Sequence, residues 1–150
     1  MSDAAADDPS IAGGWLGTYY RNSYQPPVRF EATFILREPE GAFGGTILDD
    51  GPLGEAVVLR AVQSGRHVRF TKSYRHRPPE RATGPIRYLG TLSEDGLRVF
   101  GTWELTIRRG GAGDGARVVG RWDARRLWGE GAASEATLFP EPAAVPALSP

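Results

Sequence analysis

The sequence contains no cysteine, one methionine and only two histidines among its 150 residues. Without cysteine, the protein cannot build a disulfide framework, a thiolate metal site or a cysteine nucleophile. The absence also fits a reducing cytoplasm. The two histidines, His67 and His76, are not accompanied by clustered acidic residues, which makes a histidine metal site a poor interpretation. We therefore expect neither a metal nor another cofactor.

Neither sign of charge is in excess, since 18 basic residues balance 18 acidic ones. A nucleic-acid-binding domain normally carries a basic footprint, so nucleic acid is not an expected partner. No apolar run approaches the ~20 residues that a membrane-spanning helix needs. The acidic beginning MSDAAADDPS lacks the basic and apolar regions of a signal peptide. We expect a cytoplasmic protein without a membrane partner.

Two alternating apolar runs flank the short turn at residues 93–96. Side chains two apart in a strand point to the same face, so each run has one apolar face. A loop of this length and composition is typical of a β-hairpin. The apolar positions are Ile86, Tyr88, Gly90 and Leu92 before the turn, and Leu97, Val99, Gly101 and Trp103 after it.

The same alternation recurs along the chain between turns rich in Gly, Pro, Asp and Ser. It predicts strands at residues 13–20, 28–37, 43–48, 55–62, 67–74, 86–92, 97–103 and 117–127. About eight short strands predict an all-β fold, an antiparallel up-and-down barrel that leaves no open sheet edge. We expect the barrel to span residues 13–128, between a disordered arm at 1–12 and a disordered Ala- and Pro-rich tail at 129–150.

Glycine lies two residues from an aromatic residue in four of these strands, at Trp15/Gly17, Tyr88/Gly90, Gly101/Trp103 and Gly120/Trp122. Glycine lets a strand bend sharply, and a large ring on the same face can cover the bare backbone. The pairs therefore favour a closed barrel over an open sheet.

The opening Gly14-Trp15-x-Gly17-x-Tyr19 resembles the first strand of the calycins, the superfamily of lipocalins, fatty-acid-binding proteins and avidins. Later blocks, among them Gly101-x-Trp103 and Gly120-x-Trp122, resemble small bacterial barrel domains of this type. The resemblance implies that Trp15 packs at the closed end beneath an arginine of a late strand, Arg121 or Arg125. The polar set of an avidin-type biotin site is not matched in spacing by Asn22, Ser23 and Tyr24 with Trp103, so biotin is not predicted.

Lys72 is the most informative single residue, because it shares the inward face of its strand with Phe70 and Tyr74. An ammonium group buried without a partner is costly. One interpretation makes Lys72 the anchor of an anionic or carbonyl-bearing ligand. The alternative is an internal ion pair, with Glu104 or Glu55 as the partner, or a lysine that reaches water at the mouth of the barrel.

Aromatic residues on the same inward faces could form the wall of a ligand cavity, since small-molecule sites are mostly apolar with a few polar groups. The alternative is a barrel core filled by these side chains. The candidate ligand-binding residues are Lys72, Tyr74, Tyr88, Trp103 and Phe70.

The leading functional hypothesis is a non-catalytic barrel that holds a small, partly apolar ligand. If Lys72 anchors the ligand, that ligand is anionic or carries a carbonyl group. A second hypothesis is a barrel isomerase or cyclase, in which Lys72, Tyr74, Tyr88 and Glu104 would act on the substrate. A third is a protein-interaction module that uses the basic loop 75–84 and the tail. The calycin resemblance is also compatible with a homodimer.

Overall fold

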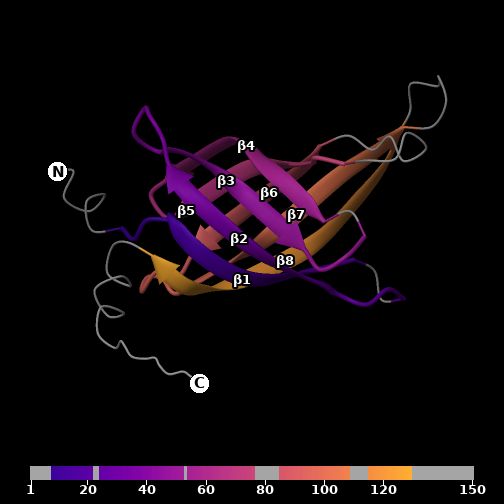
Figure 1. Cartoon of the computed structure of the whole chain (residues 1–150), viewed down its shortest axis with the longest axis horizontal. Helices are drawn as coiled ribbons and strands as arrows, with labels where there is room; N and C mark the ends of the chain where they lie inside the picture. The colour runs from indigo at the N-terminus through magenta and orange to yellow at the C-terminus, as the bar shows by residue number, and fades with distance from the viewer. Residues whose placement is uncertain (1–7, 22–23, 53, 77–84, 109–114, 130–150) are drawn as a thin grey trace.

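A computed structural model describes residues 8–21, 24–52, 54–76, 85–108 and 115–129. These residues form eight strands that close into one antiparallel barrel in sequence order, with β8 paired to β1 (Figure 1). The predicted all-β, eight-stranded up-and-down barrel is confirmed. The strands are β1 (Gly13–Tyr20), β2 (Val28–Leu36), β3 (Ala42–Asp49), β4 (Glu55–Ser64), β5 (His67–Tyr74), β6 (Ile86–Leu92), β7 (Arg98–Arg108) and β8 (Gly115–Gly129).

Alternation along each strand decides which side chains fill the barrel. In β2, Phe30, Ala32 and Phe34 are buried. The intervening Arg29 and Glu31 are exposed. The two longest strands, β7 and β8, form a hairpin that extends beyond the other strands (Figure 1). Strands that follow one another in the sequence are also hydrogen-bonded neighbours in the barrel, an arrangement typical of short connections.

Glycines in the barrel wall make room for tryptophan rings. A Cβ atom at Gly90 would lie 2.6 Å from the ring of Trp122, and one at Gly120 would lie 2.5 Å from the ring of Trp103. The ring that covers each glycine comes from a different strand, not from the aromatic residue two positions away in the same strand. The sequence pattern thus indicated closure correctly, but the contacts that use these glycines run between strands.

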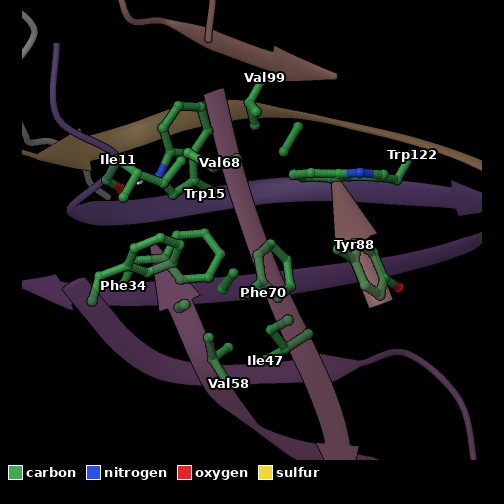
Figure 2. Packing of buried hydrophobic residues seen from close by; sticks show 14 of the residues in the cluster. Ile11, Trp15, Phe34, Ile47, Val58, Val68, Phe70, Tyr88, Val99 and Trp122 are labelled. Atoms are coloured by element: carbon green, nitrogen blue, oxygen red, sulfur yellow. Dashed lines mark hydrogen bonds between the residues drawn. The ribbon is translucent and has the colours of Figure 1, made fainter. Parts of the chain in front are cut away.

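One end of the barrel is filled by a continuous apolar core (Figure 2). Phe70 lies at its centre, with its ring centroid 5.5 Å from that of Phe34 and 5.8 Å from that of Trp122. Leu92 and Val99, which flank the hairpin turn, are fully buried. This part of the barrel is therefore a packed interior, as the filled-core interpretation expected.

The chain before β1 closes this end of the barrel. We expected residues 1–12 to form a disordered arm, but Pro9, Ile11 and Ala12 are buried, and Ile11 belongs to the core. Gln63 holds this segment by donating to the Pro9 carbonyl at 2.7 Å and accepting from the Ile11 amide at 2.9 Å. The folded part therefore begins before Gly13, because the closed end of a barrel needs an apolar cover that the strands do not supply.

Arg126 locks the same segment in place. Its guanidinium group lies 4.5 Å from the centre of the Trp15 ring, and it donates to the carbonyls of Ser10, Ala12 and Gly96. An arginine of a late strand thus covers the first-strand tryptophan. The residue is Arg126, not Arg121 or Arg125, because the register of β1 with β8 pairs Trp15 with Arg126, which continues the buried face of Trp122 and Ala124.

Candidate binding site at the distal end of the barrel

The distal end of the barrel, opposite the N-terminal segment, is where β1, β3 and β5 end. Three polar side chains from these strands, Tyr19, Asp49 and Tyr74, point inward there. Asp49 lies two residues after the buried Ile47, so it continues the inward face of β3. Lys72 precedes Tyr74 by two residues on β5, so it lies on the same inward face and deeper in the barrel.

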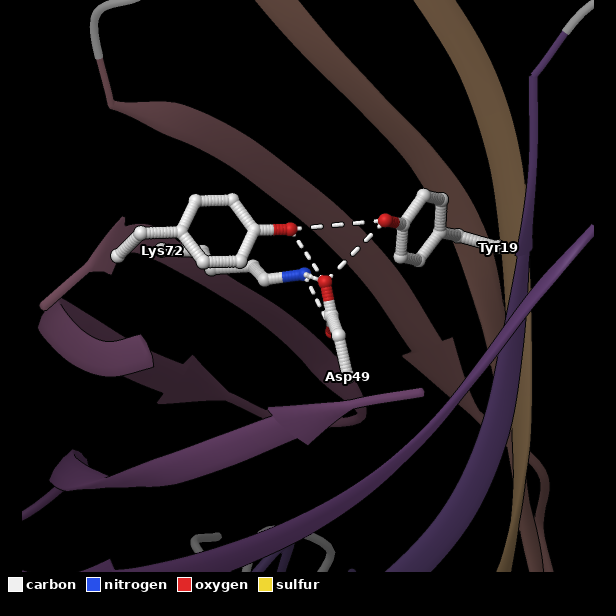
Figure 3. A network of polar contacts seen from close by, with 4 residues as sticks. Tyr19, Asp49 and Lys72 are labelled. Carbon is white, nitrogen blue, oxygen red and sulfur yellow. Dashed lines mark hydrogen bonds and ion pairs between the residues drawn. The ribbon is translucent and has the colours of Figure 1, made fainter. Parts of the chain in front are cut away.

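An ion pair between Asp49 and Lys72 crosses the interior (Figure 3). The Lys72 ammonium donates to both carboxylate oxygens, to Oδ1 at 2.9 Å and to Oδ2 at 3.0 Å. Lys72 is 1% exposed and Asp49 is 6% exposed. Ala56 on β4 stands opposite both Ile47 and Tyr74, and its small side chain leaves space for the pair to bridge from β3 to β5.

Two tyrosines complete the shell of the Asp49 carboxylate. The hydroxyl of Tyr19 donates to Oδ2 at 3.1 Å, and the hydroxyl of Tyr74 donates to the same oxygen. The two hydroxyls lie 3.5 Å apart. Asp49 therefore accepts four hydrogen bonds from three side chains, which compensates a buried carboxylate well.

The ammonium of Lys72 is also enclosed by aromatic rings. It lies 4.6 Å from the ring centre of Tyr19, 4.8 Å from that of Tyr74 and 5.6 Å from that of Tyr88. A cation within about 6 Å of a ring face is attracted to it. Burial lowers the pKa of Lys72, and the Asp49 carboxylate acts in the opposite direction.

The tyrosines of the site stay protonated. Burial raises the pKa of Tyr19 to about 12, with the Asp49 charge adding to the effect. Burial, followed by the nearby Asp49 carboxylate, also raises the pKa of Tyr74 and of Tyr88. All three hydroxyls are therefore protonated and able to donate a hydrogen bond at neutral pH.

The hydroxyl of Tyr88 differs from the other two, because within the described part of the chain it makes no hydrogen bond. Tyr88 is only 2% exposed, and its ring stacks on Phe70 with centroids 4.9 Å apart and an interplanar angle of 10°. Leaving a buried hydroxyl without a partner costs about 1–3 kcal/mol. Tyr88 thus presents a buried, protonated donor beside the closed Asp49–Lys72 pair.

Partly exposed side chains surround the Asp49–Lys72 pair, which forms the polar floor of the distal end. They lie on the inward faces of five strands, pack against the core and are mostly apolar. The set, which we call the distal rim, consists of Tyr19, Tyr74, Ile86, Leu105 and Val118. Trp103 lies just below the distal rim, 6.1 Å from Tyr19 and edge-on to it, and its indole donates to the Tyr20 carbonyl at 3.1 Å.

All five residues that we predicted from the sequence face the interior, but they lie at two depths. Lys72, Tyr74 and Tyr88 come together at the distal end. Trp103 supports the distal rim. Phe70 lies deeper, among the rings of the core.

The partners that we named for Lys72 were wrong. Glu55 and Glu104 lie at outward positions of their strands and pair instead with Arg75 at 3.3 Å and with Arg117 at 2.8 Å. Sequence reasoning missed Asp49, because it assigned that residue to the turn after a strand ending at Leu48. The alternation Gly45, Ile47, Asp49 was the signal that would have found it.

In comparisons with known proteins, no family model, no curated protein and no solved structure matches the chain. Within the described ranges, no group of three or more His, Cys, Asp or Glu side chains is arranged to hold a metal ion. The described residues also include no helix with the length and hydropathy of a membrane span.

Proposed function

We propose that the distal end of the barrel binds a small, neutral and partly apolar molecule without transforming it. The observation that carries the proposal is the Tyr88 hydroxyl, which is buried, protonated and without a partner in the described part of the chain. A ligand carbonyl or ether oxygen would accept its hydrogen bond and remove the cost of the unsatisfied group. The distal rim would supply the apolar contacts that such sites usually have.

Charge balance supports a neutral ligand over an anionic one. The ammonium of Lys72 already donates to both oxygens of Asp49, so the pair adds no net charge to the floor of the site. An anion would have to displace Asp49 and leave that carboxylate buried without its partner. Lys72 then serves to hold Asp49 and the tyrosines in place rather than to contact the ligand.

The protonation of the tyrosines supports binding over catalysis. A tyrosinate base at neutral pH would need a lowered pKa, whereas the pKa values of Tyr19, Tyr74 and Tyr88 are all raised. The isomerase or cyclase hypothesis would require Lys72 to leave Asp49, and Glu104 lies outside the site with Arg117. The interaction-module hypothesis concerns the basic loop 75–84 and the tail at 129–150, of which residues 77–84 and 130–150 lie outside the described residues.

The contact between Arg126 and Trp15 supports the calycin resemblance and is the strongest structural argument for it. Calycins bind their ligands inside the barrel, which agrees with a site at the distal end. We retain a cytoplasmic location and a homodimer as proposals that follow from composition and from this resemblance.

Titration with the fluorescent ketone prodan tests the proposal. Prodan is neutral and flat, it carries one carbonyl acceptor, and its emission reports both apolar surroundings and hydrogen bonding. We expect saturable binding to the full chain that weakens about tenfold in Tyr88→Phe, because one buried hydrogen bond is lost.

Tyr20→Phe is the matched control, since Tyr20 lies on the outer face of β1 beside Arg121. An anionic naphthalene sulfonate should bind more weakly than prodan. Equal affinity of Tyr88→Phe and the parent protein for prodan, or displacement of prodan by the sulfonate at lower concentration than prodan itself requires, would overturn the proposal.

A further inference from the structure

A second concave site lies on the outer surface of the barrel wall, on the opposite side of the strands from the interior. Its cavity has a volume of about 340 Å³ and lies across the outer faces of β4 to β7. Small-molecule sites have volumes of roughly 300–1,000 Å³. The outward side chains that line it are Arg60, Arg69, Thr71, Arg87, Leu89, Thr102 and Glu104. We call this the outer groove.

Three arginines give the outer groove an uncompensated positive charge. Arg60, Arg69 and Arg87 form no ion pair with any acidic residue that the structure describes. Glu104, the one acidic side chain in the lining, is already paired with Arg117 at 2.8 Å. Three guanidinium groups around one cavity suit a ligand with several anionic oxygens, because each presents a planar fork of donors.

The backbone of Arg60 indicates that its position is specified. Leu59 pairs with Thr71 and Val62 with Arg69, so two residues of β4 bulge opposite one residue of β5. In this bulge Arg60 adopts a left-handed conformation with φ 54°, which glycine adopts at much lower cost. The bulge turns Arg60 outward beside Arg69. Because glycine would adopt this conformation with less strain, an arginine at this position indicates a role for its side chain.

The surroundings define the rest of the ligand. Thr71 and Thr102 add hydroxyl groups to the lining, and Leu89, which is 56% exposed, adds an apolar surface. We propose that the outer groove binds a small phosphorylated molecule, whose phosphate is held by Arg60, Arg69 and Arg87 and whose apolar part covers Leu89. The size of the cavity favours such a molecule over an acidic peptide, which would extend beyond it.

Isothermal titration calorimetry of the full chain with phenyl phosphate tests this site. We expect saturable binding of one phenyl phosphate per chain, and a loss of affinity of about tenfold in both Arg60→Gly and Arg87→Gln. Arg60→Gly should fold at least as stably as the parent protein, so that lost affinity is not lost folding. Arg29→Gln, on the exposed outer face of β2, is the control of equal charge change and should bind normally.

Three results would overturn the outer groove as a phosphate site. One is the absence of saturable binding, and another is an equal loss of affinity in Arg29→Gln, which would show only a general charge effect. The third is displacement of phenyl phosphate by a hexaglutamate peptide that binds more tightly, which would make the groove a peptide site. Prodan binding at the distal end should be unchanged in Arg60→Gly, so the two sites fail or succeed separately.

Discussion

The Lys72 ammonium lies 2.9 Å from Oδ1 of Asp49 in an interior where both residues are nearly inaccessible to solvent. The two strands that carry them are not neighbours, because β4 lies between β3 and β5. The pair therefore fixes the width of the barrel at the distal end, and it positions the hydroxyls of Tyr19 and Tyr74.

Breaking this pair from one side should be strongly destabilising. Asp49→Asn leaves the ammonium of Lys72 buried without a counter-charge, and we expect the free energy of unfolding to fall by about 3–5 kcal/mol. Urea denaturation measures the change. The double variant Asp49→Leu with Lys72→Met should recover most of the loss, because no buried charge remains. Asp50→Asn at the neighbouring exposed position is the control, and an equal loss there would contradict the account.

Stability should fall at alkaline pH. The pKa of Tyr19 is about 12 in the folded protein and 10.0 ordinarily, so the folded state binds more protons between these pH values. The free energy of unfolding therefore decreases as pH rises through this window. The raised pKa values of Tyr74 and Tyr88 act in the same direction. The lowered pKa of Lys72 has the opposite effect and raises the free energy of unfolding as pH approaches 10.5. We expect the three tyrosines together to outweigh this one lysine.

Denaturation of the parent protein and of Tyr19→Phe between pH 8 and 12 checks this dependence. The variant should lose stability less steeply above pH 10, because it lacks one of the three groups. Identical slopes for the two proteins, or a stability that rises through this window, would refute the assignment.

Arg126 should stabilise the N-terminal segment as well as the barrel. Arg126→Met removes donors to the carbonyls of Ser10, Ala12 and Gly96, and we expect a loss of about 2 kcal/mol or more. Hydrogen exchange should show faster exchange at the Ile11 amide, which Gln63 otherwise protects. Arg125→Met, at the exposed neighbouring position, should leave that exchange unchanged.

Glycines beneath tryptophan rings should not accept even one methyl group. Gly120→Ala places a Cβ against the Tyr20 carbonyl oxygen and 2.5 Å from the Trp103 ring, and overpacking of this kind costs about 1–3 kcal/mol. Thermal unfolding measures the effect, and the intrinsic tryptophan fluorescence should change because the Tyr20 carbonyl and the Trp103 ring that bonds to it are both displaced. Gly51→Ala, with no atom within 4 Å of the added Cβ, is the control. Similar melting temperatures for both variants would count against the close contact.

The alternation of apolar residues predicted the strands and their inward faces, because in a barrel the two faces of each strand meet opposite environments. The strand ends were less predictable. Asp49 looks like a turn residue in sequence, and its burial becomes favourable only through Lys72, Tyr19 and Tyr74 on other strands. The burial of Ile11 was missed for a similar reason, since the space it fills is created by the closed end of the barrel as a whole.

For the residues of the site, too, the pattern within one strand was predictable and the pairing between strands was not. Lys72 was identifiable, since a lysine between Phe70 and Tyr74 on an inward face needs an explanation. The choice between a ligand and an ion pair depended on long-range pairing that one strand does not encode. Arg126, by contrast, was identifiable from the sequence, because it continues the inward alternation of Trp122 and Ala124 in β8.

Removing the Tyr88 hydroxyl should separate stability from binding. Tyr88→Phe keeps the stack on Phe70 but deletes a buried group without a partner in the described residues. We expect the free energy of unfolding in the ligand-free protein to stay constant or rise by about 1 kcal/mol. A loss of more than that would show that the hydroxyl already has a structural partner.

Native mass spectrometry of the full chain purified from its own host tests the central claim most directly. We predict that the parent protein and Tyr20→Phe each carry one small neutral molecule per chain, and that Tyr88→Phe carries much less of it. Denaturing analysis of the released molecule should find an apolar compound with an oxygen acceptor. A parent protein without any such molecule, or equal retention by Tyr88→Phe, would contradict the claim that the distal end is a binding site built on Tyr88.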